Sequence, residues 1–247
     1  GFIAAAIFLF NPVINIIDVL PDFFGYLLLL GALSKWADLC PGVEDAVQGL
    51  GRLRWFMLFK MLAMVLVPMV DNTYVLVITF GFAIIELIYV IPAIGKVFDG
   101  FEYFGTRFNG KSIYANYKNV RTITYLFFYT KILLPVVPEL CSLSDYEYNG
   151  FVTSGVQINF ASYKGALLII ELFLTLLIGI MWLVNIIPYF KRIGLDTNFL
   201  SRVSAQYDLE VSNNIGLTFR RALHSILWIT SAGFIFLLNL WIDGVNV

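Results

Sequence analysis

Four charged residues lie inside long apolar stretches of this sequence, and they are the side chains best placed to do chemistry. Glu86 and Lys131 fall within runs of aliphatic and aromatic residues, and so do Lys60 and Glu171. A charge at the centre of a membrane helix costs roughly 2.5–3.5 kcal/mol, so such residues usually bind a solute, relay protons or pair with each other. Counted along the expected helices, the depths of Glu86 and Lys131 differ by only ~4 Å. This depth match predicts that the two side chains meet.

The environment of these charges leaves several interpretations open. Lys60 lies near the inner end of its run, where a long side chain can reach the headgroups. Glu171 lies near the outer end of its own run and could reach water in the same way. For Glu86 with Lys131, the alternatives are a functional site, a purely structural ion pair and two separately solvated positions.

A polar stripe near the start of the chain adds further candidates. Asn11, Asn15, Asp18 and Asp22 are spaced at i, i+4, i+7 and i+11, which places them on one face of a continuous helix. Such a stripe should face protein or water rather than lipid. The alternative is that Pro21 ends any such helix and that Asp18 or Asp22 caps the next one.

The elements that must position these residues are predicted from composition. Hydrophobic residues make up 60% of the 247 positions, charged residues 13%, and the mean hydropathy is +0.83. Soluble domains are nearer half apolar and a quarter charged. We therefore expect an all-α, polytopic transmembrane helix bundle in a lipid bilayer, forming one membrane domain over 1–247. The expected spans lie near 2–17, 19–37, 55–70, 74–97, 122–140, 165–190 and 221–243.

The first two expected spans form one apolar stretch that polar residues interrupt. Two short spans, or one span plus a re-entrant segment, would both fit, so seven spans are expected with six as the alternative. Two Ile-Pro pairs, at 91–92 and 187–188, lie near the inner ends of the spans expected at 74–97 and 165–190, and each is followed by basic residues. They could belong to a parallel internal repeat, although helix ends in general collect proline and lysine.

Basic residues predict the orientation. Thirteen of the 16 Lys and Arg residues fall in segments on one side of the expected spans, and short basic loops stay in the cytoplasm. We therefore expect a multi-pass protein of the cell membrane with its C-terminus outside. On the cytoplasmic side, 43–53 predicts an amphipathic helix along the membrane surface, and the aromatic-rich segment 98–120 has an interfacial composition. The outer loop 141–164 contains Asn-Gly at 149–150, which suggests a small hairpin.

Composition and motifs also exclude functions. A net charge of −1 argues against nucleic acid, and one histidine with two cysteines argues against metal or haem cofactors. Residues 105–112 match the phosphate-loop pattern, but that loop requires a preceding strand, for which this linker has no room. No nucleotide partner is therefore expected. The sequence contains no recognisable catalytic motif and leaves open whether the protein is an enzyme, while favouring a non-enzymatic role.

Two functions remain. The first is a small transporter or channel for a cation or a small polar solute, with its path lined by Glu86, Lys131, Glu171 and the 11–22 stripe. The second is a non-catalytic partner subunit, assembly factor or sensor that binds another protein or a second copy of itself. In either case the lipid bilayer is the surrounding medium.

Overall fold

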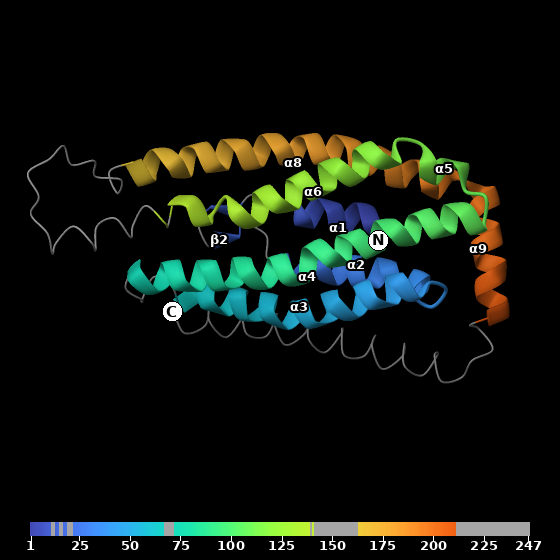
Figure 1. Ribbon diagram of the computed structural model, residues 1–247, viewed down its shortest axis with the longest axis horizontal. Helices are drawn as coiled ribbons and strands as arrows, with labels where there is room; N and C mark the ends of the chain where they lie inside the picture. The colour runs from blue at the N-terminus through green and yellow to red at the C-terminus, as the bar shows by residue number, and fades with distance from the viewer. Residues whose placement is uncertain are drawn as a thin grey trace, which may run out of the picture. The chain divides into compact units, whose positions relative to one another are not determined.

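The computed structural model describes residues 1–10, 13–14, 17–18, 22–66, 72–138, 140 and 163–210 (Figure 1). The chain divides into two compact units, Gly1–Leu200 and Ser201–Val247. Of the second unit, residues 201–210 are described, and they form the later part of a helix. The candidate site lies wholly in the first unit.

The described part of the chain is almost entirely helical, which confirms the all-α prediction. A minimal antiparallel ladder pairs Val13 with Asp18 and Ile14 with Ile17. In chain order the elements are α1 (Phe2–Leu9), β1 (Val13–Ile14), β2 (Ile17–Asp18), α2 (Asp22–Ala37), α3 (Pro41–Leu66), α4 (Asn72–Arg107), α5 (Lys111–Tyr114), α6 (Tyr117–Leu133), α8 (Lys164–Leu195) and α9 (Thr197–Glu210).

Three described helices are long and apolar enough to cross a membrane, fewer than the seven spans predicted. They cover Val77–Arg107, Tyr117–Pro138 and Lys164–Leu195. These helices are consistent with a membrane protein. The expected span at 221–243 and most of the outer loop 141–164 lie outside the described residues.

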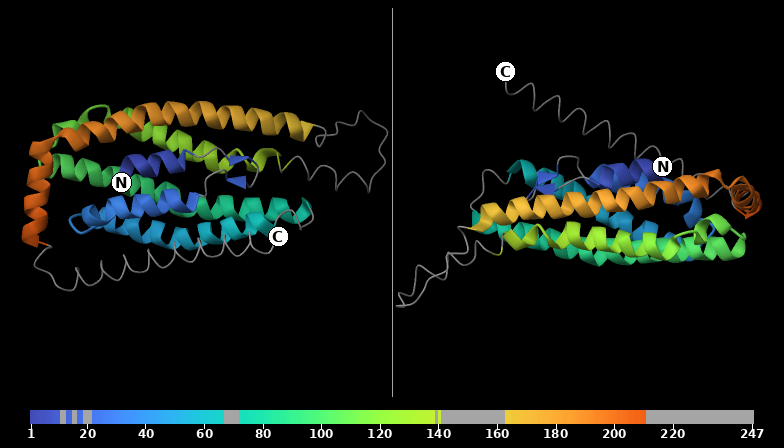
Figure 2. Two further views of the ribbon diagram at one scale, coloured as in Figure 1. Left: turned by 180° about the vertical axis from the view of Figure 1, so that it is seen from behind. Right: turned by 90° about the horizontal axis from the view of Figure 1, so that it is seen from above.

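The two spans predicted at 2–17 and 19–37 are replaced by a short helical hairpin. α1 has 8 residues and α2 has 16, so their lengths of ~12 Å and ~24 Å fall short of a ~30 Å bilayer core. The two helices are antiparallel, since Phe2 contacts Trp36 while Phe8 contacts Phe24. β1 and β2 lie at the tip of this hairpin, as the views in Figures 1 and 2 show. The prediction of a continuous helix with Asn11, Asn15, Asp18 and Asp22 on one face is therefore wrong.

The other helices are longer than predicted. Residues 43–53 do form a helix, but as the beginning of the continuous α3 rather than as a separate surface helix. α4 runs through Pro92 to Arg107, and α8 runs through Pro188 to Leu195, so both helices continue beyond the span ends expected near 97 and 190. At ~54 Å and ~48 Å, α4 and α8 exceed the thickness of a bilayer core.

Two ends of the helices are used below as landmarks. The basic end is where α4 ends at Arg107, α6 begins at Tyr117 and α8 ends at Leu195. The opposite end is where α4 begins at Asn72 and α8 begins at Lys164. The α1–α2 hairpin lies toward the basic end, with its tip directed toward the opposite end (Figures 1 and 2).

Apolar side chains lie outside and charged ones inside in the spanning part of these helices. The exposed stripe on α8 contains Ile169, Phe173, Leu177, Ile180 and Val184, and that on α4 contains Val77, Phe80, Ile84 and Ile88. The charged side chains within the apolar stretches of α3, α4, α6 and α8 are buried: Lys60, Glu86, Lys131 and Glu171. This is the distribution expected where the surroundings are lipid, because lipid solvates aliphatic groups and excludes charges.

Candidate functional site: a hairpin tip and two buried ion pairs

Lys131 of α6 makes a buried ion pair with Asp22, the first residue of α2. Its Nζ donates a hydrogen bond to Asp22 Oδ1 at 2.5 Å and another to the Leu9 carbonyl oxygen at 2.7 Å. The side chains are only 2% and 1% exposed, and the ammonium lies 5.9 Å from the centre of the Phe127 ring. The ammonium group is thus enclosed by a carboxylate, a carbonyl and an aromatic ring.

The break between α1 and α2 creates this environment. Leu9 is the last residue of α1, where helical carbonyls lack partners within the helix and carry partial negative charge. Asp22 begins α2, where a carboxylate is favoured by the positive end of the helix dipole. The cation therefore lies against the negative end of one helix and the acid at the positive start of another.

The second ion pair joins α3 to α4. Lys60 Nζ lies 2.8 Å from Glu86 Oε1, and the two side chains are 11% and 5% exposed. The predicted contact between Glu86 and Lys131 is therefore wrong, since each of these residues has a different partner. The depth estimate used only the position of each residue along its helix. Which residues at the same depth meet depends on which helices lie side by side. Lys60 is buried and paired rather than extended to the headgroups.

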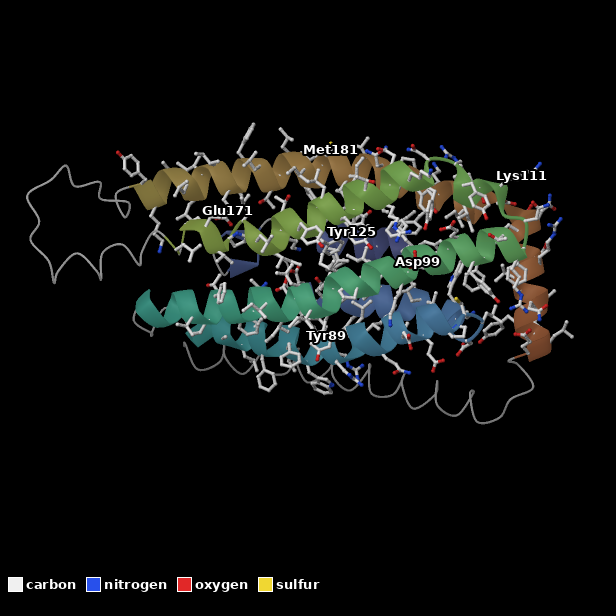
Figure 3. All side chains as sticks on the ribbon, in the orientation of Figure 1. Tyr89, Asp99, Lys111, Tyr125, Glu171 and Met181 are labelled. Atoms are coloured by element: carbon white, nitrogen blue, oxygen red, sulfur yellow. The ribbon has the colours of Figure 1, made fainter. Side chains whose placement is uncertain are left out.

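Glu171 adds a third buried carboxylate, on α8. It is 2% exposed and so does not reach water as predicted, and Thr175, one turn later, is also buried. In Figure 3 Glu171 lies in the half of α8 away from Lys111, which marks the basic end. Within the described residues, the buried charged groups are thus three carboxylates and two ammonium groups.

The side chains of the remaining stripe residues are not described. Asn11 and Asn15 lie outside the described residues. Asp18 is described only through its backbone, which pairs with Val13 in the ladder. The stripe residue whose side chain is described, Asp22, pairs with Lys131.

Toward the basic end the helices are closed by packed aromatic rings. Phe2 stacks on Phe190 with ring centres 4.7 Å apart, and Trp36 packs edge-on against Phe104 at 4.7 Å. Phe101 contacts both Phe2 and Phe190. The aromatics of 98–120 were predicted to lie at the lipid interface, but Phe98, Phe101, Phe104 and Phe108 are buried. This segment is mainly the end of α4 and builds a core.

A small apolar cavity lies between the hairpin and the long helices. Its volume is about 60 Å³. Ala5, Ala6 and Leu9 of α1 line one side, and Thr124, Phe128 and Trp182 are among the residues that line the other. The Thr124 hydroxyl donates to the Val120 carbonyl and accepts from Trp182 Nε1, so it is already satisfied. The cavity therefore presents an apolar wall.

An open polar hollow lies at the basic end, with a volume of about 700 Å³. Glu102, Tyr117 and Lys118 line it, together with Arg121, which forms an ion pair with Asp99 at 2.8 Å. Asp99 is 63% exposed, so this pair is accessible to solvent. Because this ion pair is exposed to solvent, it contributes much less energy than the buried Asp22–Lys131 pair.

Sequence analysis missed two features of this site. Leu9 contributes through its backbone carbonyl, which no side-chain pattern reports. Lys60 was visible as a charge within an apolar run but was attributed to the membrane interface. In the part of the chain that the structure describes, no group of three or more His, Cys, Asp and Glu residues could hold a metal ion.

The phosphate-loop pattern at 105–112 is preceded by α4, not by a strand. Gly105 lies within α4, and Lys111 begins the four-residue α5. Comparison with protein-family models, curated proteins and solved structures finds no match to this chain.

Proposed function

We propose that this protein is a small membrane transporter for a cation or a small polar solute, with the Asp22–Lys131 pair at its binding site. The observation that carries the proposal is the helix break at that pair. Transporters commonly place substrate and ion sites where discontinuous helices end inside the membrane, because unpaired helix ends supply charge and hydrogen bonds there. Here the α1 carbonyl end and the α2 amino end both meet at Lys131.

The cost of burying these charges supports a functional role. Two ion pairs and Glu171 occupy positions that aliphatic residues would fill, and a buried pair is often no more stable than its apolar replacement. Stability alone therefore gives little reason to place Asp22, Lys60, Glu86 and Lys131 in the interior. Movement of a solute or a proton past these residues would explain why they are charged.

The placement of the groups suggests the direction of access. The packed rings around Phe101 close the basic end. Glu171 lies in the other half of α8 (Figure 3), Lys131 lies near the far end of α6, and Glu86 lies in the first half of α4. With the basic end in the cytoplasm, as the positive-inside rule predicts for a cell-membrane protein, the opposite end would face outside, and the enclosed pair would be reached from there once a path opens. Transport would then require the α1–α2 hairpin to move relative to α4 and α8.

The experiment is a flux measurement with purified protein in liposomes. Gradients of Na⁺, K⁺, H⁺ and n-propylammonium are imposed in turn, and charge movement or internal pH is recorded. We expect flux for at least one of these cations, reduced at least tenfold by Asp22→Asn. Lys96→Met, which removes an exposed lysine 2.9 Å from Asp45, is the matched control and should leave flux unchanged. Absence of flux for all four cations would overturn cation transport through the Asp22–Lys131 site.

A further inference from the structure

We infer that the transported solute is a small organic primary ammonium ion. Its ammonium group would replace that of Lys131 on Asp22, and its apolar part would occupy the cavity beside Leu9. This inference rests on the proposed transport function and names the solute class for the same site.

The site is already complementary to a primary ammonium group. The Lys131 ammonium donates to Asp22 Oδ1 and to the Leu9 carbonyl, and Phe127 presents its ring 5.9 Å away. A carboxylate, a carbonyl and an aromatic face are together the partners that bind alkylammonium ions. A ligand of the same chemistry would find the same three partners.

A free acceptor allows the exchange to begin before Lys131 leaves. Asp22 Oδ2 is buried and accepts no hydrogen bond within the described residues. An incoming ammonium could bind this oxygen while Oδ1 still accepts from Lys131. The carboxylate would then never be left without a cation, which in a buried site would be costly.

The adjoining cavity favours an organic ion over an inorganic one. Leu9 links the two regions, since its carbonyl accepts from Lys131 and its residue lines the cavity. Because a cavity needs roughly 10–15 Å³ to hold one water, a cavity of about 60 Å³ accommodates about four to six atoms of that size. That volume fits a short alkyl chain. Its apolar wall offers nothing to replace the water that a hydrated Na⁺ or K⁺ would lose.

The first test is ligand-dependent thermal unfolding in detergent. We expect n-propylammonium chloride to raise the melting temperature of the protein saturably, by about 2–4 °C or more. NaCl and tetramethylammonium chloride at equal concentration should not do so, because neither carries the N–H donors of a primary ammonium. Equal shifts with all three salts would overturn the inference.

Two variants at Lys131 distinguish the effect of opening space beside Asp22 from the effect of removing the lysine charge. Lys131→Ala exposes Asp22 to a free ammonium and should lower the half-saturating propylammonium concentration at least tenfold. Lys131→Met is the matched control, since it removes the charge but fills the space, and should show a much smaller gain. If the two variants respond alike, displacement of the lysine ammonium is wrong.

A third variant tests the cavity without altering any charge. Ala6→Leu fills the space beside Leu9, so it should raise the half-saturating propylammonium concentration at least tenfold while changing the methylammonium value less than twofold. A parallel loss for both ions, or no change for either, would overturn the assignment of the apolar part. Because Ala6→Leu keeps Lys131 and Asp22, it also provides the test if the lysine variants fail to fold.

The liposome experiment distinguishes this inference from the proposed function. Propylammonium flux that Asp22→Asn abolishes supports both the transport function and the ammonium assignment. Flux of Na⁺, K⁺ or H⁺ alone, with no propylammonium binding, would overturn the ammonium assignment and leave transport intact. No flux of any cation would overturn transport itself.

Discussion

Breaking the Asp22–Lys131 pair should be the most destabilising charge removal in the described chain. Asp22→Asn removes the carboxylate charge and leaves the Lys131 ammonium with neutral oxygen acceptors, and Lys131→Met leaves a carboxylate that is 1% exposed without a cation. Loss of one partner of a buried pair costs about 3–5 kcal/mol. At about 2–4 °C per kcal/mol for a chain of this size, each single variant should melt about 6–20 °C below the natural protein.

The double variant should recover much of that loss, because it leaves no unpaired charge. Unfolding can be followed by tryptophan fluorescence, since Trp182 is buried and stacks on Phe127 with ring centres 4.2 Å apart. The exposed pair Lys96–Asp45 is the control, and its removal should cost only about 0–1 kcal/mol.

A cross-cycle tests the choice of partner. Lys131→Met and Glu86→Gln should act additively, because Glu86 pairs with Lys60 instead. Two results would refute the reasoning: additive effects for Asp22 with Lys131, or strong coupling between Glu86 and Lys131. The second result would restore the pairing that the depth estimate predicted.

Three further expectations follow from the fold. In a double-mutant cycle on melting temperature, Lys60→Met and Glu86→Gln should each destabilise the protein and should be coupled, though less strongly than the Asp22–Lys131 pair because Lys60 is more exposed. With the native cysteines replaced, a membrane-impermeant maleimide on intact cells should label Tyr163→Cys and spare Lys118→Cys, and the reverse would invert the orientation. Lys111→Ala should leave stability and flux unchanged, and the purified natural protein should show no saturable ATP binding by calorimetry, because a helix rather than a strand precedes the phosphate-loop pattern.

The amino-acid sequence by itself determined the class of the protein and the residues that matter most. The excess of apolar residues predicts long helices, since a bilayer core requires every backbone polar group to be bonded within its own segment. Charged residues inside such apolar runs can be recognised as unusual, because a bilayer core also excludes charged side chains. Asp22, Glu86, Lys131 and Glu171 could thus be identified as candidates from residue type and position alone.

Element boundaries were less well determined, because hydropathy does not record where a helix begins or ends. The stretch over 2–37 is apolar enough to suggest spans despite its polar residues, yet the chain turns back after Leu9 and forms a hairpin. Conversely, the spans expected near 74–97 and 165–190 end soon after Pro92 and Pro188, but α4 and α8 continue to Arg107 and Leu195. Packing against neighbouring helices outweighs the loss of one backbone hydrogen bond.

The tertiary structure alone decided which charges meet. Lys131 and Asp22 are separated by 109 residues, and only the packing of the α1–α2 hairpin brings them together. Helical rise fixes the depth of a residue but not the neighbour that its side chain faces, so Glu86 and Lys131 could share a depth and still bind different partners. The Leu9 carbonyl joins the site because α1 ends there, and that ending is a property of the folded hairpin rather than of the side chain of leucine.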